Sequence, residues 1–234
     1  LSIVVPGEAI GVSRRVADAL RATGTDTLFA DCNATAPQTV EEMNTIVTYA
    51  GSRFIDASII GRPPNSNTVS RFYASGPHAK ALAELDGKGI EVHVLGDIIG
   101  SASGLKMCNA ALSKGMNALY ITVLAAAEAM GLSQELHSEI LSKAPPGYQQ
   151  FKSGIPQLPL KAQRYISEME EIAASFGHVG VTPLFHRGAA EVFRVLAQTR
   201  FAQEPVETPD TSRTMEQTIA GFVECLPERA SKPR

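Results

Sequence analysis

The sequence predicts an α/β domain followed by an all-helical domain. Over residues 1–98, short β-like runs alternate with helical runs, which is the pattern of βαβ units on a mostly parallel sheet. From Ser101 onward the strand pattern stops, and a helical stretch of almost entirely apolar or small residues runs from Ser101 to Gly131. We therefore expect a first domain over residues 1–98, a helical domain over 99–225 that begins with this long helix, and a polar tail over 226–234.

The expected elements of the first domain follow from hydrophobic patterning and turn residues. Short apolar runs predict strands, and amphipathic runs predict helices. Gly51 is placed to cap the second helix, and the Gly/Pro/Asn-rich run 61–67 predicts a loop. The expected strands are residues 1–6, 25–32, 53–61, 68–76 and 90–96, and the expected helices are 8–22, 39–51 and 78–89.

The helical domain is divided by Gly- and Pro-rich breaks. These breaks are residues 145–146, 154–156, 177–180 and 204–209, and the run GDIIGSASG (96–104) is interpreted as the junction between the two domains. The expected helices are 101–131, 133–144, about 157–176, 181–203 and 212–224. On the third of them, Lys161, Arg164, Glu168 and Glu171 follow helical spacing, which is typical of a solvated face with salt bridges.

Composition excludes several classes of function. A net charge of −3 lacks the basic surplus that a nucleic-acid partner requires. The three cysteines are far apart, so neither a disulfide framework nor a zinc site is expected, and a reducing cytoplasmic setting fits best. The long helix carries polar residues that cut its apolar run below the roughly 20 residues of a membrane span, so we expect a core helix and no membrane. The chain begins directly on a predicted strand without methionine, and we expect that an N-terminal segment is missing.

Lys106 is the best candidate for a catalytic residue. It lies near the start of the apolar helix, and Asn109, Ser113 and Asn117 follow it at helical spacing, so a narrow polar stripe runs along one face. A lysine in this place either extends its head group into water or acts as a general acid or base in a cleft that lowers its pKa. In the second case Asn109, one turn further on, would hold the substrate by a hydrogen bond.

The ends of the predicted strands provide candidate ligand contacts, because parallel α/β sheets bind ligands beyond the carboxyl ends of their strands. Three such ends are residues 5–7, residues 31–34 and residues 56–61. Pro6 and Asn33 could flank a planar ring, and Gly61 would admit close approach of a backbone. Each end taken alone is a turn signal more often than a site.

Several segments together resemble the β-hydroxyacid dehydrogenases, which include 3-hydroxyisobutyrate dehydrogenase and the 6-phosphogluconate dehydrogenase-like proteins. The segments are FADCNATAP, RFIDASIIGRPP, YASGP and SGLKMCNAALSKGMNALYITVLAAAEAMG, in this order, with G-x-x-x-x-K-x-x-N at the head of the long helix. IIGRPP and KAQRYISEMEEIA point to a branch with a distinctive C-terminal helical domain. The resemblance covers about residues 1 to 200 and implies a partial Rossmann-like sheet followed by a helical dimerisation domain.

The resemblance implies an NAD(P)-dependent oxidoreductase acting on a hydroxyl or carbonyl of a small polar, hydroxyacid-like substrate. By the family match, Lys106 handles the hydroxyl proton and Asn109 orients the substrate. Val5, Pro6 and Asn33 would touch the nicotinamide side of NADP or NAD. The family dimerises through its helical domain, so a homodimer that buries the long helix is implied.

The chain departs from the family pattern in two places. The glycine fingerprint G-x-G-x-x-G of a dinucleotide site does not occur, which leaves open whether this chain binds the dinucleotide by itself. The family's D-x-x-x-S-G-G substrate loop becomes residues 56–62, with Ile60 in place of the serine, Gly61 retained, and Arg62 nearby as a source of charge. Two alternatives therefore stand beside the dehydrogenase: a non-catalytic dimeric binding or scaffold relative that has lost nucleotide binding, and an imine-reductase-like enzyme.

Overall fold

The computed structural model describes residues 1–61, 68–143 and 147–227. The chain divides into two compact units, and each consists of two stretches of sequence. Unit 1 comprises Leu1–Leu112 with Glu170–Pro183, and unit 2 comprises Ser113–Met169 with Leu184–Arg234. The units therefore divide within the long helix, some residues beyond the end of the last strand. Unit 1 contains the α/β part of the chain and the first turns of that helix.

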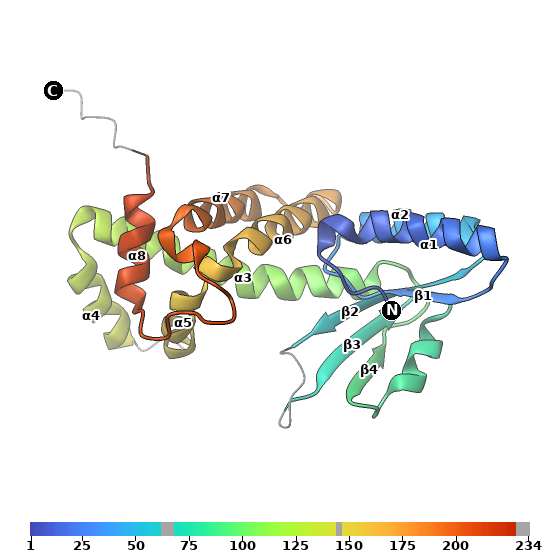
Figure 1. The fold of residues 1–234 in the computed structure, drawn as a ribbon. Coiled ribbons are helices and arrows are strands. Elements are labelled where there is room, and N and C mark those ends of the chain that lie inside the picture. Colours follow the sequence, from blue (N-terminus) through green and yellow to red (C-terminus); the bar gives the residue numbers. More distant parts are fainter. Residues whose placement is uncertain (62–67, 144–146, 228–234) are drawn as a thin grey trace. The chain divides into compact units, whose positions relative to one another are not determined.

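A four-stranded sheet forms the centre of unit 1 (Figure 1). Its strands lie in the order β1 (Leu28–Asp31), β2 (Arg53–Ile60), β3 (Ser70–Ser75) and β4 (Ile90–Val94). β1 pairs with β2, and β3 with β4, in parallel, whereas β2 and β3 are antiparallel. The parallel pairs are those joined through helical segments, because a parallel connection needs a crossover. The α/β class is confirmed, with one antiparallel pair where the sequence connects two strands by a loop.

The predicted strand over residues 1–6 is wrong in its extent. Only Ser2 joins the sheet, through an isolated parallel bridge to Asp31. The Ser2 amide donates to the carbonyl of Ala30 (2.8 Å), and the Cys32 amide donates to the carbonyl of Ser2 (2.9 Å). A 3-10 turn, η1 (Pro6–Glu8), follows soon afterwards, because proline favours the first position of a helical turn and removes a ladder donor.

Two hydrophobic clusters cover the two faces of the sheet. α1 (Ala9–Thr23) and α2 (Pro37–Tyr49) pack together on one face (Figure 1), where Val40, Met43 and Val47 meet Phe29 and Phe54. On the other face, Ile55 and Ala57 of β2 pack with Phe72 and with Leu82 of η2 (Ala79–Leu85). Neighbouring residues of β2 thus belong to opposite clusters, as the alternation of a strand requires. The predicted helix at 78–89 is a 3-10 segment.

From Ser101 onward the described residues are mainly helical, as predicted. α3 (Ser101–Met130) and α6 (Pro159–His178) contribute to both units, whereas the remaining helices belong to unit 2. α8 begins with a capping box, in which Thr214 and Gln217 satisfy each other's backbone amides. The sequence does not predict the short helix α5. The remaining helices are α4 (Ser133–Lys143), α5 (Tyr148–Gly154), η3 (Ile155–Gln157), α7 (Leu184–Gln198), η4 (Arg200–Gln203) and α8 (Met215–Glu224).

α3 is long and apolar enough to cross a membrane by length and composition alone, a test that the core helix of a soluble protein also passes. Its residues alternate with the helical period between buried positions, such as Met107 and Ile121, and exposed ones. Leu112 is 71% exposed and Met130 is 65% exposed. One face of the helix therefore packs inside its own chain and another presents apolar side chains.

The predicted solvated face of α6 is wrong at Glu168. This carboxylate is buried in unit 2, where it pairs with Lys114 of α3 at 2.6 Å and with Arg164 at 3.1 Å. The Lys114 ammonium also lies 5.2 Å from the centre of the Tyr165 ring. Helical spacing identifies the Arg164–Glu168 pair, but it cannot show that a lysine from a distant helix closes over the carboxylate.

Candidate functional site

The predicted site residues of the described part of unit 1 lie around the carboxyl ends of β1 and β2. The two strands run in parallel, and Asp31 of β1 lies beside Asp56 of β2 in the register. Both aspartates are fully buried. Since the carboxyl ends of parallel strands meet at one edge of a sheet, the segments that follow them also share this edge. This is the edge at which the sequence predicts a ligand.

Lys106 lies on the second turn of α3, and its side chain is half-buried. Its Nζ donates a hydrogen bond to the backbone carbonyl of Ile59, the last residue but one of β2. The ammonium is therefore directed at the end of β2, rather than simply extended into water. The ammonium is thus held by a backbone carbonyl, and the role of Lys106 as a general acid or base stays a prediction.

The predicted substrate residues lie near this end of β2. Ile60 follows Ile59 and is buried, and Gly61 is exposed with φ +130° and with no atom within 4 Å of the place where a Cβ would stand. A backbone of this conformation favours glycine. Asn109, one turn beyond Lys106, is exposed. Arg62 lies outside the residues that the structure describes.

The side chain of Asn33 holds the N-terminal segment just before Val5 and Pro6. Its Oδ1 accepts the amide of Val4 (2.6 Å), and its Nδ2 donates to Ser2 (3.1 Å) and to Asp31 (2.5 Å). Val4 immediately precedes Val5, which is 59% exposed, and Pro6, which is half-buried. The amide of Asn33 is thus used within the protein, where it fastens the N-terminal segment to the end of β1.

The burial of Asp31 has an electrostatic consequence. Desolvation raises the pKa of Asp31 from its ordinary 3.8 to about 6, and the hydrogen bonds from Asn33 oppose this rise without cancelling it. The neighbouring charge of Asp56 adds to it. Burial likewise raises the pKa of the Cys32 thiol to about 12, so that thiol is not a nucleophile at neutral pH.

Asp56 is a residue whose role the sequence does not reveal. One of its oxygens accepts hydrogen bonds from the Ser75 hydroxyl (2.8 Å) and from the amides of Gly100 (2.9 Å), Ala102 (3.1 Å) and Ser103 (3.2 Å). The other accepts the Ser103 hydroxyl. These amides form the first turn of α3, so Asp56 caps the helix that carries Lys106, where negative charge also complements the helix dipole. An aspartate inside the largely apolar strand β2 is the sequence signal for this role.

A second carboxylate from a distant element caps α2. Glu171 of α6 accepts the amide of Ala36 (2.6 Å) and the hydroxyl of Thr39 (3.4 Å). All three residues belong to unit 1. The loop between β1 and α2, which contains Asn33, is therefore held at both ends. The predicted solvated face of α6 is wrong at this residue as well.

Two buried hydroxyls at the same edge lack a hydrogen-bond partner. Thr35 follows β1 and Ser58 is part of β2, and both are fully buried with an unpaired side-chain oxygen. Buried polar atoms in proteins are usually paired with protein, water or a ligand. No glycine-rich loop that would cradle a pyrophosphate is found in the sequence. No group of three or more metal-ligating side chains occurs within the described residues.

Comparison of sequences gives two matches. A family model described as a domain of unknown function, DUF1932, matches residues 127–196, within the helical part. An uncharacterized 28.5 kDa protein in the 7S RNA 5′ region of Methanothermus fervidus is 28% identical over 137 residues, which are 58% of this chain. The matched part is 50% of that protein, so the chain spans half the length of the curated relative it matches.

Comparison of structures identifies the fold. A conserved hypothetical protein from Sinorhizobium meliloti aligns with a TM-score of 0.72 at 21% identity, covering 96% of this chain and 74% of that one. A conserved protein of unknown function, noted for its structural similarity with 3-hydroxyacid dehydrogenases, aligns with a TM-score of 0.61 at 26% identity over 83% and 74% of the two chains. The Mycobacterium tuberculosis 3-hydroxyisobutyrate dehydrogenase with L-serine aligns at 0.57 and 17% identity over 91% and 75%.

Proposed function

Because the chain belongs to the superfamily of 3-hydroxyacid dehydrogenase-like proteins, we propose that it is an NAD(P)-dependent oxidoreductase in which Lys106 is the general acid and base. The proposed substrate is a small polar molecule that bears a hydroxyl or carbonyl group. The observation that carries this proposal is the position of Lys106: its ammonium is half-buried, directed at the carbonyl of Ile59, and located at the carboxyl end of β2.

The chemistry follows from the groups at this edge. A nicotinamide, when bound, supplies the hydride acceptor or donor. Lys106 takes the proton from a substrate hydroxyl, or returns it to a carbonyl oxygen, and a partly desolvated ammonium is suited to this exchange. Asn109, exposed one turn further along α3, orients the substrate through its amide. Ile60 and the open backbone at Gly61 form the neighbouring wall.

Replacement of the lysine tests the proposal. Lys106→Met removes the proton-carrying group and keeps most of the side-chain volume, so turnover should fall about a hundredfold or more, the usual contribution of general acid–base catalysis. Lys80→Met is the matched control, because Lys80 is exposed on η2. The assay follows formation of reduced nicotinamide with a panel of hydroxyacids and with NAD or NADP. Turnover by Lys106→Met equal to that of the control would refute the proposed role.

A non-catalytic binding protein is the second candidate, because the sequence contains no G-x-G-x-x-G fingerprint. Isothermal titration of this chain with NADPH and with NADH separates the two functions. Binding at submicromolar concentration contradicts the scaffold. Absence of binding, together with absence of turnover on the substrate panel, favours it.

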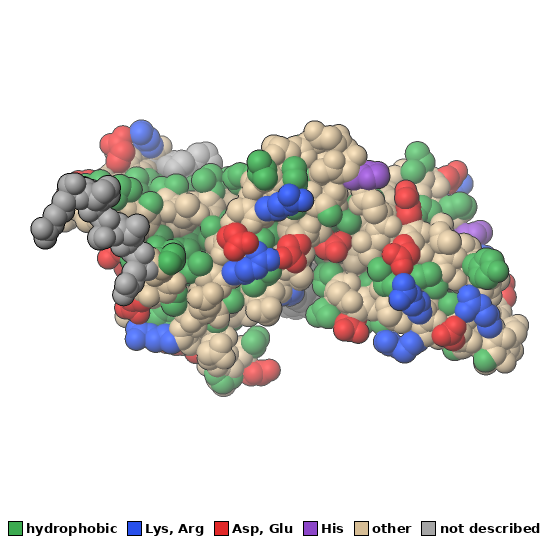
Figure 2. Space-filling model, turned by 90° about the horizontal axis from the view of Figure 1, so that it is seen from above, with side chains coloured by type: hydrophobic (Ala, Val, Ile, Leu, Met, Phe, Trp, Pro, Cys, Tyr) green, Lys and Arg blue, Asp and Glu red, His purple; other side chains and the backbone are tan. Residues whose placement is uncertain are grey.

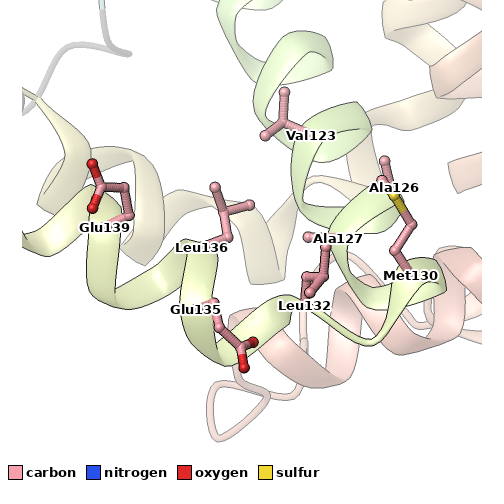
Figure 3. A pocket seen from close by; sticks show the side chains of 8 residues that line it. All are labelled: Val123, Ala126, Ala127, Met130, Leu132, Glu135, Leu136 and Glu139. Atoms are coloured by element: carbon pink, nitrogen blue, oxygen red, sulfur yellow. The ribbon is translucent and has the colours of Figure 1, made fainter.

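We also propose that the protein is a cytoplasmic homodimer joined through α3. Within unit 2, α3 exposes an apolar stripe formed by Met116 (41% exposed), Leu119 (44%), Val123 (39%) and Met130 (65%). The stripe leads into a groove of about 590 Å³ between the end of α3 and α4, whose wall includes Leu136 (Figure 3). On the face drawn in Figure 2, by contrast, charged side chains of both signs are interspersed with apolar ones.

A further inference from the structure

The geometry points to Asp56 as the positioning residue for Lys106: its buried carboxylate fixes the first turn of α3 against β2, so that the lysine ammonium meets the carbonyl of Ile59. The inference deepens the proposed function and rests on it for its catalytic meaning. Its structural part is independent of any substrate or cofactor.

Several hydrogen bonds from two elements converge on the carboxylate of Asp56. Its two oxygens accept five hydrogen bonds, two from hydroxyls and three from amides, all from β3 or from the start of α3. Ser75 strengthens this attachment, because its hydroxyl donates to Asp56 and also accepts the amide of Ala102 (3.0 Å). The start of α3 is therefore attached to the sheet by polar contacts with a defined direction.

α3 and β2 are joined by two polar contacts in the same order along each element, Ser103 with Asp56 and Lys106 with Ile59. Asp56 and Ile59 are three residues apart on β2, about 10 Å along an extended strand. Ser103 and Lys106 are three residues apart on α3, about 4.5 Å along a helix, and lie on one face of it. The lysine side chain spans the difference. The position of the ammonium thus depends on where the first turn of α3 is held.

Burial of the Asp56 carboxylate has a cost in desolvation free energy. Asp56 is fully buried, and a buried carboxylate contributes little to stability even when its hydrogen bonds are satisfied. A helix start can be capped at the protein surface by serine, threonine, asparagine or aspartate without burying a charge. The carboxylate here lies inside the sheet and takes its contacts from two elements, which suits the fixing of a register rather than simple capping.

The experiment measures the reactivity of Lys106 in the full chain. Trace acylation with acetic anhydride over a range of pH, quantified by peptide mass spectrometry, gives the rate and titration midpoint for Lys106 relative to the exposed Lys80. Asp56→Asn keeps the size of the side chain but removes its charge and turns one of the two acceptor oxygens into a donor, so the side chain no longer accepts hydrogen bonds at both positions. We expect the relative rate at Lys106 to rise about tenfold, the protection lost with one hydrogen bond to a charged group.

Two further variants keep the inference falsifiable. Ser103→Ala removes only the hydroxyl contact and should raise the relative acylation rate of Lys106 by a smaller factor. This variant provides the test if Asp56→Asn fails to fold. Val47→Ala, in the core between α2 and the sheet, lowers stability without touching α3 and should leave the titration of Lys106 unchanged. The inference is overturned if the relative acylation rate of Lys106 changes equally in Val47→Ala. It is also overturned if this rate is unchanged in folded Asp56→Asn and Ser103→Ala.

The same measurements separate this inference from the proposed function. If the acylation rate of Lys106 changes in Asp56→Asn while Lys106→Met keeps full turnover, Asp56 positions Lys106 but Lys106 is not the catalytic residue. If the acylation rate of Lys106 is unchanged in Asp56→Asn while Lys106→Met loses turnover, Lys106 is catalytic but Asp56 does not position it.

Discussion

Replacement of Asp31 by asparagine should stabilise the protein at neutral pH. Asp31 is fully buried, and its pKa is raised from 3.8 to about 6, chiefly by desolvation. Between these two values the folded protein binds a proton that the unfolded chain has released, so stability falls as the pH rises. The shift of about two units corresponds to about 3 kcal/mol at 1.36 kcal/mol per unit. This contribution of Asp31 is present in full below pH 4 and is lost above about pH 6.

The change Asp31→Asn removes the titration and keeps the shape of the neutral acid. The carbonyl oxygen of the new amide can still accept from Nδ2 of Asn33, while the weaker contact with the Asn33 amide (3.3 Å) is lost. Near pH 4 the variant should therefore match the wild type within about 1 kcal/mol. Above about pH 6 it should be more stable, by up to about 3 kcal/mol.

Urea unfolding, followed by circular dichroism from about pH 4 to about pH 8, measures this difference. The other carboxylates are present in both proteins, so subtraction of one curve from the other gives the contribution of Asp31 together with its coupling to Asp56. Asp97→Asn is the matched control, since it makes the same substitution at an exposed aspartate. A difference for Asp31→Asn that does not change with pH would refute the reasoning.

Three further predictions concern unit 2. Glu168→Gln should lower the free energy of unfolding by about 2 kcal/mol in urea titrations, because the Lys114 ammonium, only 14% exposed, loses its counter-charge. Gly221→Ala should cost about 1–3 kcal/mol and lower the melting temperature, since a Cβ would lie 2.5 Å from the ring of Phe201. Leu119→Glu should convert the proposed dimer into a monomer in sedimentation velocity runs, and an unchanged sedimentation coefficient would exclude α3 as the interface.

The elements that the sequence predicts well are those with a local cause. α1 ends at Gly24 with φ +64°, and Gly51 follows α2 with φ +80°, so glycines just beyond apolar periodic runs mark both ends. The strand over residues 1–6 fails because its hydrogen bonds depend on a neighbour: Ser2 alone meets the end of β1. Whether an apolar run becomes a strand is decided by pairing, which the run itself does not contain.

The candidate site shows the same limit at the level of side chains. Helical spacing places Lys106 and Asn109 on one face, and the family resemblance assigns their roles. Helical spacing does not predict which carbonyl accepts the hydrogen bond of Lys106, because that depends on how α3 packs against β2. The seating is fixed by Asp56, whose contacts come from positions 19 to 47 residues away in the chain.

The pairing of Asp31 with Asp56 connects the two halves of the site. The two buried carboxylates are register partners on parallel strands, yet their hydrogen bonds serve different segments. Asp31 holds Asn33, which fastens the N-terminal segment, and Asp56 holds the start of α3, which carries Lys106. Two adjacent buried acids oppose each other electrostatically, which is one cause of the raised pKa of Asp31. An apolar pair would avoid that cost, but it could not orient polar segments. The adjacency therefore fits a sheet edge whose task is to hold the proposed nicotinamide side and the proposed proton donor in one fixed relation.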